Sequence, residues 1–204
     1  MQLIGMLDSP YVRRVAISMK LMGIPFEHRP LSVFRHYEEF RKINPVVKVP
    51  TLVCDDGEVL MDSTLIVDFL ESLVPEEKRL MPTNANDRRR ALQNIGIALM
   101  ACEKSVQRFY EVTLRPVEKQ HQPWLDRVTE QMHGAFAALE AIAGTAKPWL
   151  HGERISQDDI CIAVAWGFAQ FVMADAVPAS RYPALAAFSA RAEALPVFVE
   201  TPLD

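Results

Sequence analysis

The segment Val47-Lys48-Val49-Pro50-Thr51-Leu52-Val53, followed shortly by Met61-Asp62-Ser63-Thr64, decides how this chain is interpreted. Proline is tolerated in a sheet mainly at the first position of a strand or on an edge, so Pro50 predicts a strand that begins beside it. A residue before proline is driven into extended backbone, which leaves the N–H and C=O of Val49 pointing sideways. An extended peptide can pair with such a backbone.

A helix start follows these strand residues. Asp62-Ser63 is expected to cap a helix over residues 64–73, and the first N–H groups of a helix attract an anion. One end of the region therefore suits a peptide backbone, and the other suits a carboxylate. Together they predict a binding site for a small peptide that carries a carboxylate.

Three short motifs carry a family resemblance. Ser9-Pro10-Tyr11-Val12-Arg13-Arg14-Val15, Asn44-Pro45-Val46-Val47-Lys48-Val49-Pro50-Thr51-Leu52 and Asp62-Ser63 resemble the N-terminal half of the cytosolic glutathione transferases, of the bacterial serine-type kind with a theta- or zeta-like motif. The resemblance extends over nearly the whole chain. It implies an α/β thioredoxin-like N-terminal domain with a cis peptide bond before Pro50, and an all-α C-terminal helical bundle.

Composition excludes several classes of protein. Half of the 204 residues are hydrophobic, which is enough for a core in one or two small domains. A net charge of −4 argues against nucleic acid as a partner. No apolar stretch of about 18 residues predicts a membrane span, and residues 1–5 do not read as a secretory signal. Three widely spaced cysteines without a CxxC motif indicate neither disulfides nor a metal site, so we expect a cytoplasmic protein.

The first part of the chain alternates strands and helices. A strand, a helix ending at Gly23 and an extended segment form a βαβ unit within about 30 residues, which predicts a parallel strand pair. A hairpin and a closing helix should complete the domain. The expected strands are 3–6, 25–29, 51–54 and 59–61, and the expected helices are 11–22, 37–43 and 64–73.

The remainder is predicted to be helical. We expect a glutathione-binding domain over 1–75, a linker over 76–86 and a helical domain over 87–204. The expected helices are 87–112, 121–143, 157–173 and 183–194. Ser156 and Asp159 have the spacing of a capping box, with Ile155 and Ile160 as a hydrophobic staple. The apolar run that follows indicates a buried central helix.

The resemblance assigns thiol activation to Ser9. By analogy with cysteine, the glutathione thiol has a pKa near 8.5, and lowering it by two units requires roughly 2.7 kcal/mol. A hydroxyl that donates to the sulfur supplies about 1.5–3 kcal/mol, and a helix N-terminus adds roughly 0.3–1 kcal/mol. Ser9 is placed for both. The alternative interpretation is that Ser9 only caps the helix, and the two roles are compatible.

The resemblance also assigns residues that bind glutathione. Val49 would pair with the cysteinyl backbone, and Lys48, with His36, would meet the glycyl carboxylate. Ser63 would hold the α-carboxylate and Asp62 the α-ammonium. A solvated lysine and an ordinary helix cap are the competing interpretations of Lys48 and of the Asp62-Ser63 pair.

The second substrate is expected to bind between the domains, lined by Tyr11, Arg108 and Tyr110. The function implied is conjugation of the glutathione thiolate to a small, mostly apolar electrophile, as in detoxification, by a homodimer that needs no metal. The alternatives are a glutathione-dependent isomerase or dehalogenase, and a non-catalytic, starvation-protein-like member that binds a protein partner. The isomerase branch usually carries Ser-Ser-Cys where this chain has Asp8-Ser9-Pro10.

Overall fold

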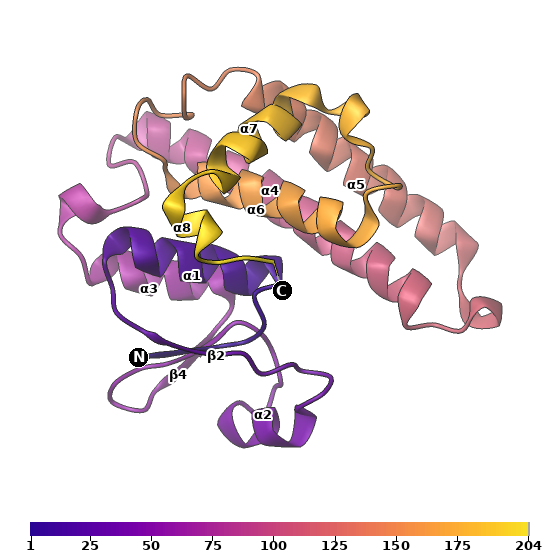
Figure 1. The fold of residues 1–204 in the computed structure, drawn as a ribbon, viewed down its shortest axis with the longest axis horizontal. Helices are drawn as coiled ribbons and strands as arrows, with labels where there is room; N and C mark the ends of the chain where they lie inside the picture. The colour runs from indigo at the N-terminus through magenta and orange to yellow at the C-terminus, as the bar shows by residue number, and fades with distance from the viewer. Residues whose placement is uncertain (204) are drawn as a thin grey trace. The chain divides into compact units, whose positions relative to one another are not determined.

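The computed structural model describes residues 1–203, which fold into two compact units. The first unit comprises Met1–Met81 together with the segment from Ala194 onward, and the second comprises Pro82–Glu193. Figure 1 shows that the first unit combines a sheet with helices and that the second consists of helices. The predicted fold class, a thioredoxin-like α/β domain with an all-α bundle, is confirmed.

The first unit is built on a four-stranded sheet with the order β2-β1-β3-β4. β1 pairs with β2 in parallel and with β3 antiparallel, and β3 pairs antiparallel with β4, as the βαβ and hairpin patterns predict. Its elements are β1 (Gln2–Ile4), α1 (Pro10–Met22), β2 (Glu27–Arg29), α2 (Tyr37–Ile43), β3 (Thr51–Val53), β4 (Val59–Met61), α3 (Ser63–Ser72), the 3-10 helix η1 (Glu76–Lys78) and α8 (Pro196–Val199).

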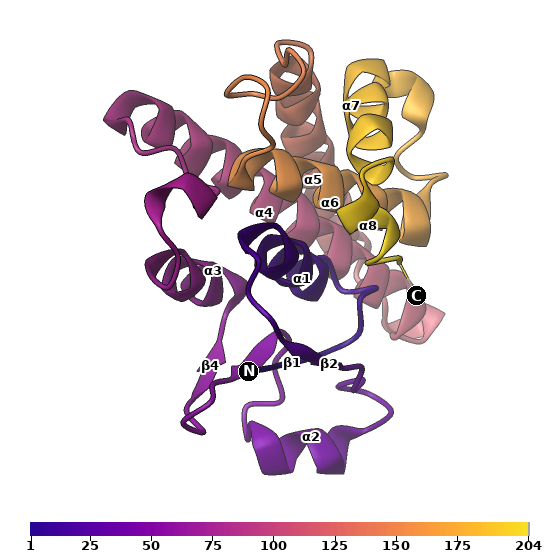
Figure 2. The same cartoon turned by 60° about the vertical axis from the view of Figure 1, so that its left-hand side comes forward.

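Helices cover both faces of this sheet. α1 and α3 lie on one face and α2 lies on the other, as Figures 1 and 2 both show. The apolar residues Val12, Val15 and Met19 recur at helical spacing on α1 and are fully buried. Gly23 ends α1 in the left-handed conformation (φ 72°), where glycine has no Cβ to clash, and its N–H donates to the carbonyl of Lys20 at 3.1 Å.

The end of the chain returns to α1. The buried Arg13 donates from Nε to the Thr201 carbonyl at 2.7 Å, and its guanidinium lies 5.5 Å from the centre of the Phe198 ring. Lys20 pairs with Glu200 at 3.0 Å near the other end of the helix. These contacts fix α8, a short helix that the sequence analysis did not predict.

The second unit is a bundle of helices. Its elements are α4 (Ala85–Thr113), η2 (Val117–Lys119), α5 (Gln122–Ala143), α6 (Gln157–Met173), η3 (Ala179–Arg181) and α7 (Pro183–Glu193). α6 has the predicted bounds and is buried on nearly all sides. The short 3-10 helices follow prolines and are too short to show a hydrophobic period, so no sequence pattern predicts them. The structure also has an unpredicted cis bond before Pro148.

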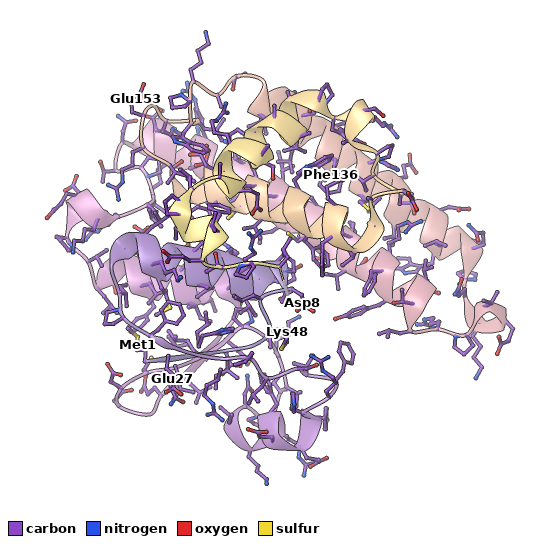
Figure 3. All side chains as sticks on the ribbon, in the orientation of Figure 1. Met1, Asp8, Glu27, Lys48, Phe136 and Glu153 are labelled. Atoms are coloured by element: carbon purple, nitrogen blue, oxygen red, sulfur yellow. The ribbon has the colours of Figure 1, made fainter. Side chains whose placement is uncertain are left out.

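Aromatic rings fill the core of the bundle. Phe136, labelled in Figure 3, lies edge-on to Trp166 with ring centres 5.8 Å apart, and Tyr182 lies 5.9 Å from Trp166. Trp166 is only 5% exposed. Trp166 therefore packs in the core of the bundle, as expected for a buried central helix.

Candidate functional site

The peptide bond between Val49 and Pro50 is cis, as the family resemblance implies. Within residues 1–203, neither the N–H nor the C=O of Val49 takes part in a hydrogen bond. Backbone groups left in this way can pair with the backbone of an extended ligand. Both backbone groups of Val49 thus remain unpaired within residues 1–203, and their pairing with a ligand stays a prediction.

Two polar residues fix the loop ahead of Pro50. The amide of the buried Asn44 donates from Nδ2 to Thr51 Oγ1 at 2.9 Å, and that hydroxyl donates to the Lys48 carbonyl at 2.7 Å. The Asn44 carbonyl oxygen Oδ1 accepts from the Val46 N–H at 3.0 Å. Asn44 and Thr51 belong to the motif that carries the family resemblance, but neither residue has a role predicted from the sequence. A buried amide in a loop is a signal of such support, because it must find partners.

Gly5 joins this loop to the start of α1. Its φ of 139° is in a region that disfavours residues with a Cβ. A Cβ added there would lie 2.6 Å from Val12 Cγ2 and 2.9 Å from Val49 Cγ1. Only glycine permits this close approach. β1 ends at Ile4, immediately before Gly5, rather than at residue 6 as predicted.

Ser9 occupies the N-cap position of α1, with extended backbone and Pro10 at the first helical position. Its carbonyl accepts from the Arg13 N–H at 2.9 Å, but its side chain makes no capping hydrogen bond. Ser9 therefore occupies the N-cap position, but its hydroxyl does not accept a hydrogen bond from a backbone N–H of the first turn. The hydroxyl remains available to donate to a ligand atom.

Tyr11 and Lys48 meet at this end of the unit. The Lys48 Nζ lies 5.9 Å from the centre of the Tyr11 ring, and the Lys48 side chain is exposed. Figure 3 labels Lys48 and Asp8, which stands immediately before Ser9 in the chain. A cation held over an aromatic ring is restricted in orientation but keeps its charge, so Lys48 can still meet a carboxylate.

His36 is held by its own loop. The N–H of Ser32 donates to His36 Nδ1 at 3.1 Å, and His36 lies at the N-cap position of α2. Among the residues that the structure describes, no hydrogen bond links His36 to the other predicted binding residues. Its Nε2 atom is the one left to face a ligand.

The start of α3 is the most strongly organised part of the site. Asp62 adopts a φ of 71°, and its carboxylate Oδ1 caps the helix by accepting from the Thr64 N–H at 2.8 Å. Positive φ values in non-glycine residues cost free energy and cluster at functional sites. Ser63 is 3% exposed, and Arg14 Nη1 donates to its Oγ at 3.1 Å.

Arg14 is the functional candidate that the sequence analysis missed. It lies on α1, is 2% exposed, and also reaches Thr64 Oγ1 at 3.3 Å. The available signal was the pair Arg13-Arg14 between the apolar residues Val12 and Val15. Arginine is rarely buried without a specific partner.

The remaining predicted residues belong to the helical unit. Arg108 on α4 is partly buried, and its Nε is a buried donor with no partner in the described structure. Tyr110 is 39% exposed, and its ring centre lies 6.2 Å from that of Phe109. The structure thus gives Arg108 unused hydrogen-bonding capacity and leaves part of the Tyr110 ring open to solvent.

The protein's own thiols do not offer an obvious nucleophile. Burial raises the pKa of the Cys54 thiol, and the neighbouring carboxylates of Asp56, Glu58 and Asp55 raise it further. A raised pKa lowers the thiolate fraction at neutral pH. Within the described residues, no group of three or more His, Cys, Asp or Glu side chains is arranged to hold a metal ion. None of the helices described is both long and apolar enough to span a membrane.

Comparison with known proteins gives matches over both units. Residues 3–78 match the family model "Glutathione S-transferase, N-terminal domain", and residues 122–191 match "Glutathione S-transferase, C-terminal domain". A maleylacetoacetate isomerase from Mus musculus is 28% identical over 191 residues, covering 91% of this chain and 84% of that protein. A probable maleylacetoacetate isomerase 2 from Drosophila melanogaster is 27% identical over 156 residues, covering 73% of this chain and 65% of that protein.

Two solved structures extend the comparison. A glutathione S-transferase from Methylobacterium radiotolerans in complex with glutathione sulfonate is 27% identical, with a TM-score of 0.90 over 98% of this chain and 93% of that one. A glutathione transferase family member from Pseudomonas fluorescens Pf-5 with bound glutathione is 29% identical, with a TM-score of 0.86 over 100% of this chain and 98% of that one.

Proposed function

This chain belongs to the glutathione S-transferase family, and we propose that it binds glutathione in its first unit and transfers the thiolate to a small, mostly apolar electrophile. The observation that carries the proposal is the open hydroxyl of Ser9, which stands at a helix N-terminus and makes no capping bond. The glutathione-bound relative from Pseudomonas fluorescens supports the choice of ligand.

The proposed docking uses three places of the first unit. The cysteinyl backbone pairs with the N–H and C=O of Val49, whose hydrogen-bonding capacity is unused within residues 1–203. The γ-glutamyl head binds at the start of α3, with its α-carboxylate on Ser63 and its α-ammonium on Asp62. Lys48, assisted by His36, meets the glycyl carboxylate.

The chemistry requires a thiolate, and Ser9 supplies it by stabilisation rather than by proton abstraction. The hydroxyl donates to the sulfur anion, and a hydrogen bond to a charged acceptor contributes about 1.5–3 kcal/mol. The proton leaves to solvent. The sulfur then attacks the electrophilic atom, forming a carbon–sulfur bond as the leaving group or the π-electron pair departs.

A second candidate activity is glutathione-dependent isomerisation, which the maleylacetoacetate isomerases among the relatives favour. The two reactions share the thiolate addition and differ in the outcome. A transferase releases the conjugate, whereas an isomerase expels the thiolate after bond rotation and returns glutathione. Product analysis with a panel of electrophiles, including a cis-configured unsaturated keto acid, separates them. Residues Tyr11, Arg108 and Tyr110 are the proposed contacts of the second substrate.

We also propose a homodimer. Edge strand β4 exposes Val59 by 43% and Met61 by 40%, and Leu65 on α3 is 65% exposed. An exposed apolar edge of this kind favours association. Sedimentation equilibrium tests this: a single species at the monomer mass of 23.0 kDa at micromolar concentration contradicts it.

Calorimetric titration with glutathione tests the binding site. We expect the double variant Asp62→Ala/Ser63→Ala to lose at least a hundredfold in affinity and to flow through immobilised glutathione, because both contacts of the γ-glutamyl head are removed. The control is Asp68→Ala, which removes an exposed carboxylate further along the same helix. This variant should be retained on the matrix. Normal retention of the double variant contradicts the assignment.

A further inference from the structure

Arg14 is a buried cation that has no carboxylate partner among residues 1–203. Its side chain is 2% exposed, and its Nε is a buried donor with no hydrogen-bond partner in the part of the chain described. No carboxylate within residues 1–203 forms an ion pair with it. A guanidinium taken out of water loses solvation that two neutral hydroxyls cannot replace. The described residues therefore leave the positive charge of Arg14 only partly compensated.

The neighbouring Arg13 shows how a buried arginine of this helix is otherwise satisfied. Arg13 is 1% exposed, but its Nε donates to the Thr201 carbonyl at 2.7 Å and its guanidinium stacks on Phe198. Arg13 therefore fastens the end of the chain to α1. Arg14 instead points its Nη1 at Ser63 Oγ (3.1 Å) and Thr64 Oγ1 (3.3 Å), the first two residues of α3.

These contacts fix the direction of the Ser63 hydroxyl. A guanidinium has only donors, so the Ser63 oxygen must accept from it. The hydroxyl hydrogen is then left to point away from Arg14 and to donate to another acceptor. Because the oxygen accepts from a cation, its O–H is also polarised and becomes a stronger donor.

The charge balance at this helix start leads to the same conclusion. Asp62 already places a carboxylate there, with Oδ1 bound to the Thr64 N–H. A second carboxylate brought to Ser63 would be repelled by Asp62. The positive charge of Arg14, one hydrogen bond behind Ser63, offsets that repulsion.

We propose that Arg14 is the positioning residue for the α-carboxylate of glutathione. It orients Ser63 as a donor and supplies the buried positive charge that the ligand's anion completes. This inference rests on the proposed function, because it assumes that the γ-glutamyl head binds at α3. Arg14 lies on α1 and would act on the ligand through Ser63 of α3 rather than by direct contact.

The decisive experiment pairs a protein variant with a truncated ligand. Affinity is measured by calorimetry for glutathione and for 4-aminobutyryl-cysteinyl-glycine, which differs from glutathione only by lacking the α-carboxylate. We expect Arg14→Met to weaken glutathione at least tenfold while changing the affinity for the truncated peptide less than twofold. Arg14→Lys, which keeps the charge, should recover part of the loss. Arg41→Met, an exposed arginine on α2, is the control and should alter neither affinity.

Stability of the unliganded protein provides an independent readout. If Arg14 serves the ligand, replacing an uncompensated buried charge with methionine should leave the melting temperature of the apo protein unchanged or raise it. A role in folding alone would lower it. Should Arg14→Met fail to fold, Arg14→Gln replaces it, since glutamine can still donate to Ser63 without carrying charge.

Three results overturn the inference. They are an equal loss of affinity for both ligands, an unchanged affinity for glutathione, and a failure of both neutral variants to fold, which would assign Arg14 to the fold. If the wild-type protein binds neither peptide, the proposed function itself is wrong, and this outcome is distinct because it needs no variant. If it binds both equally, the head-group assignment at Ser63 fails while glutathione binding stands.

Discussion

A serine occupies the N-cap position of both α1 and α6, and these two serines have opposite surroundings. At the start of α6, Ser156 is 6% exposed and belongs to a capping box, in which Asp159 Oδ2 accepts from the Ser156 N–H at 2.9 Å. At the start of α1, Ser9 is only partly buried and its side chain caps nothing. The same residue type at the same helical position thus has its capacity used in one helix and left open in the other.

The α6 start is closed further by acidic side chains. The Ser156 hydroxyl lies 2.7 Å from Asp158 Oδ1 and also contacts Asp159 Oδ2, although it has one hydrogen to give. Asp158 Oδ2 receives Asn94 Nδ2 at 2.9 Å and His151 Nε2 at 3.1 Å. Burial raises the pKa of Asp159 to about 6, against the lowering effect of the Ser156 and Leu150 hydrogen bonds. A proton on Asp159 would let both short contacts be hydrogen bonds.

A residue at a helix start serves the fold when its hydrogen bonds are complete, and it can serve a ligand when they are not. Every donor and acceptor added around Ser156 comes from the protein itself. Around Ser9 and Ser63, the protein leaves hydrogen-bonding capacity or charge without a partner. Substitutions at the two helix starts should therefore affect different properties.

The largest expected effect is on stability, at Asp159. Its folded-state pKa of about 6 lies above the ordinary aspartate value of 3.8, so between these pH values the folded protein binds more protons than the unfolded chain. The contribution to the free energy of unfolding therefore falls as pH rises from about 4 to about 6, by about 3 kcal/mol at most. Asp159→Asn should remove this part of the pH dependence.

Urea unfolding of the wild type and Asp159→Asn across that pH range measures the difference. His151, Asp158 and Asn94 surround the same site, so only the difference between the two proteins isolates Asp159. The control is Asp175→Asn, which replaces an exposed carboxylate beyond the C-terminal end of α6. It should leave the pH dependence of the free energy of unfolding as in the wild type. Parallel curves for the wild type and Asp159→Asn would show that the proton is absent.

The next effect in size concerns turnover, at Ser9. We expect Ser9→Ala to lower turnover at least tenfold, near thirtyfold for a lost hydrogen bond of about 2 kcal/mol. Glutathione should still bind, and the melting temperature should hardly change because the hydroxyl caps nothing. The ultraviolet absorbance of bound thiolate, followed against pH, should show a raised thiol pKa. Undiminished turnover would remove Ser9 from the mechanism.

The smallest expected effect is on stability, at Ser156. Ser156→Ala should lower the free energy of unfolding by about 1 kcal/mol, the usual cost of a lost cap. Turnover per folded molecule should stay within twofold of the wild type. Ser156→Thr keeps a hydroxyl and should recover part of the loss. A stability unaffected by Ser156→Ala would break the contrast between the two helix starts.

Local signals in the sequence predicted most of the fold. Gly23 ends α1, α2 spans 37–43 and α6 spans 157–173 as expected, because each has its own period, cap or terminating residue. The capping box at Ser156 was readable because its members are three residues apart. The cis bond before Pro50 followed from the family resemblance, since the residues around a proline do not by themselves fix its isomer.

The sequence pattern alone determined the order of the elements, the start of α6 and the positions of Ser9, Val49 and Asp62 at the edges of elements. Three other features depend on packing between distant segments: Arg14 lies behind Ser63, Gly5 admits Val12 and Val49, and the residues from Ala194 onward return to α1. The physical reason is the range of the interactions: periods and caps join residues within one or two turns, whereas the Arg14–Ser63 bond spans 49 residues and exists only once two helices have packed.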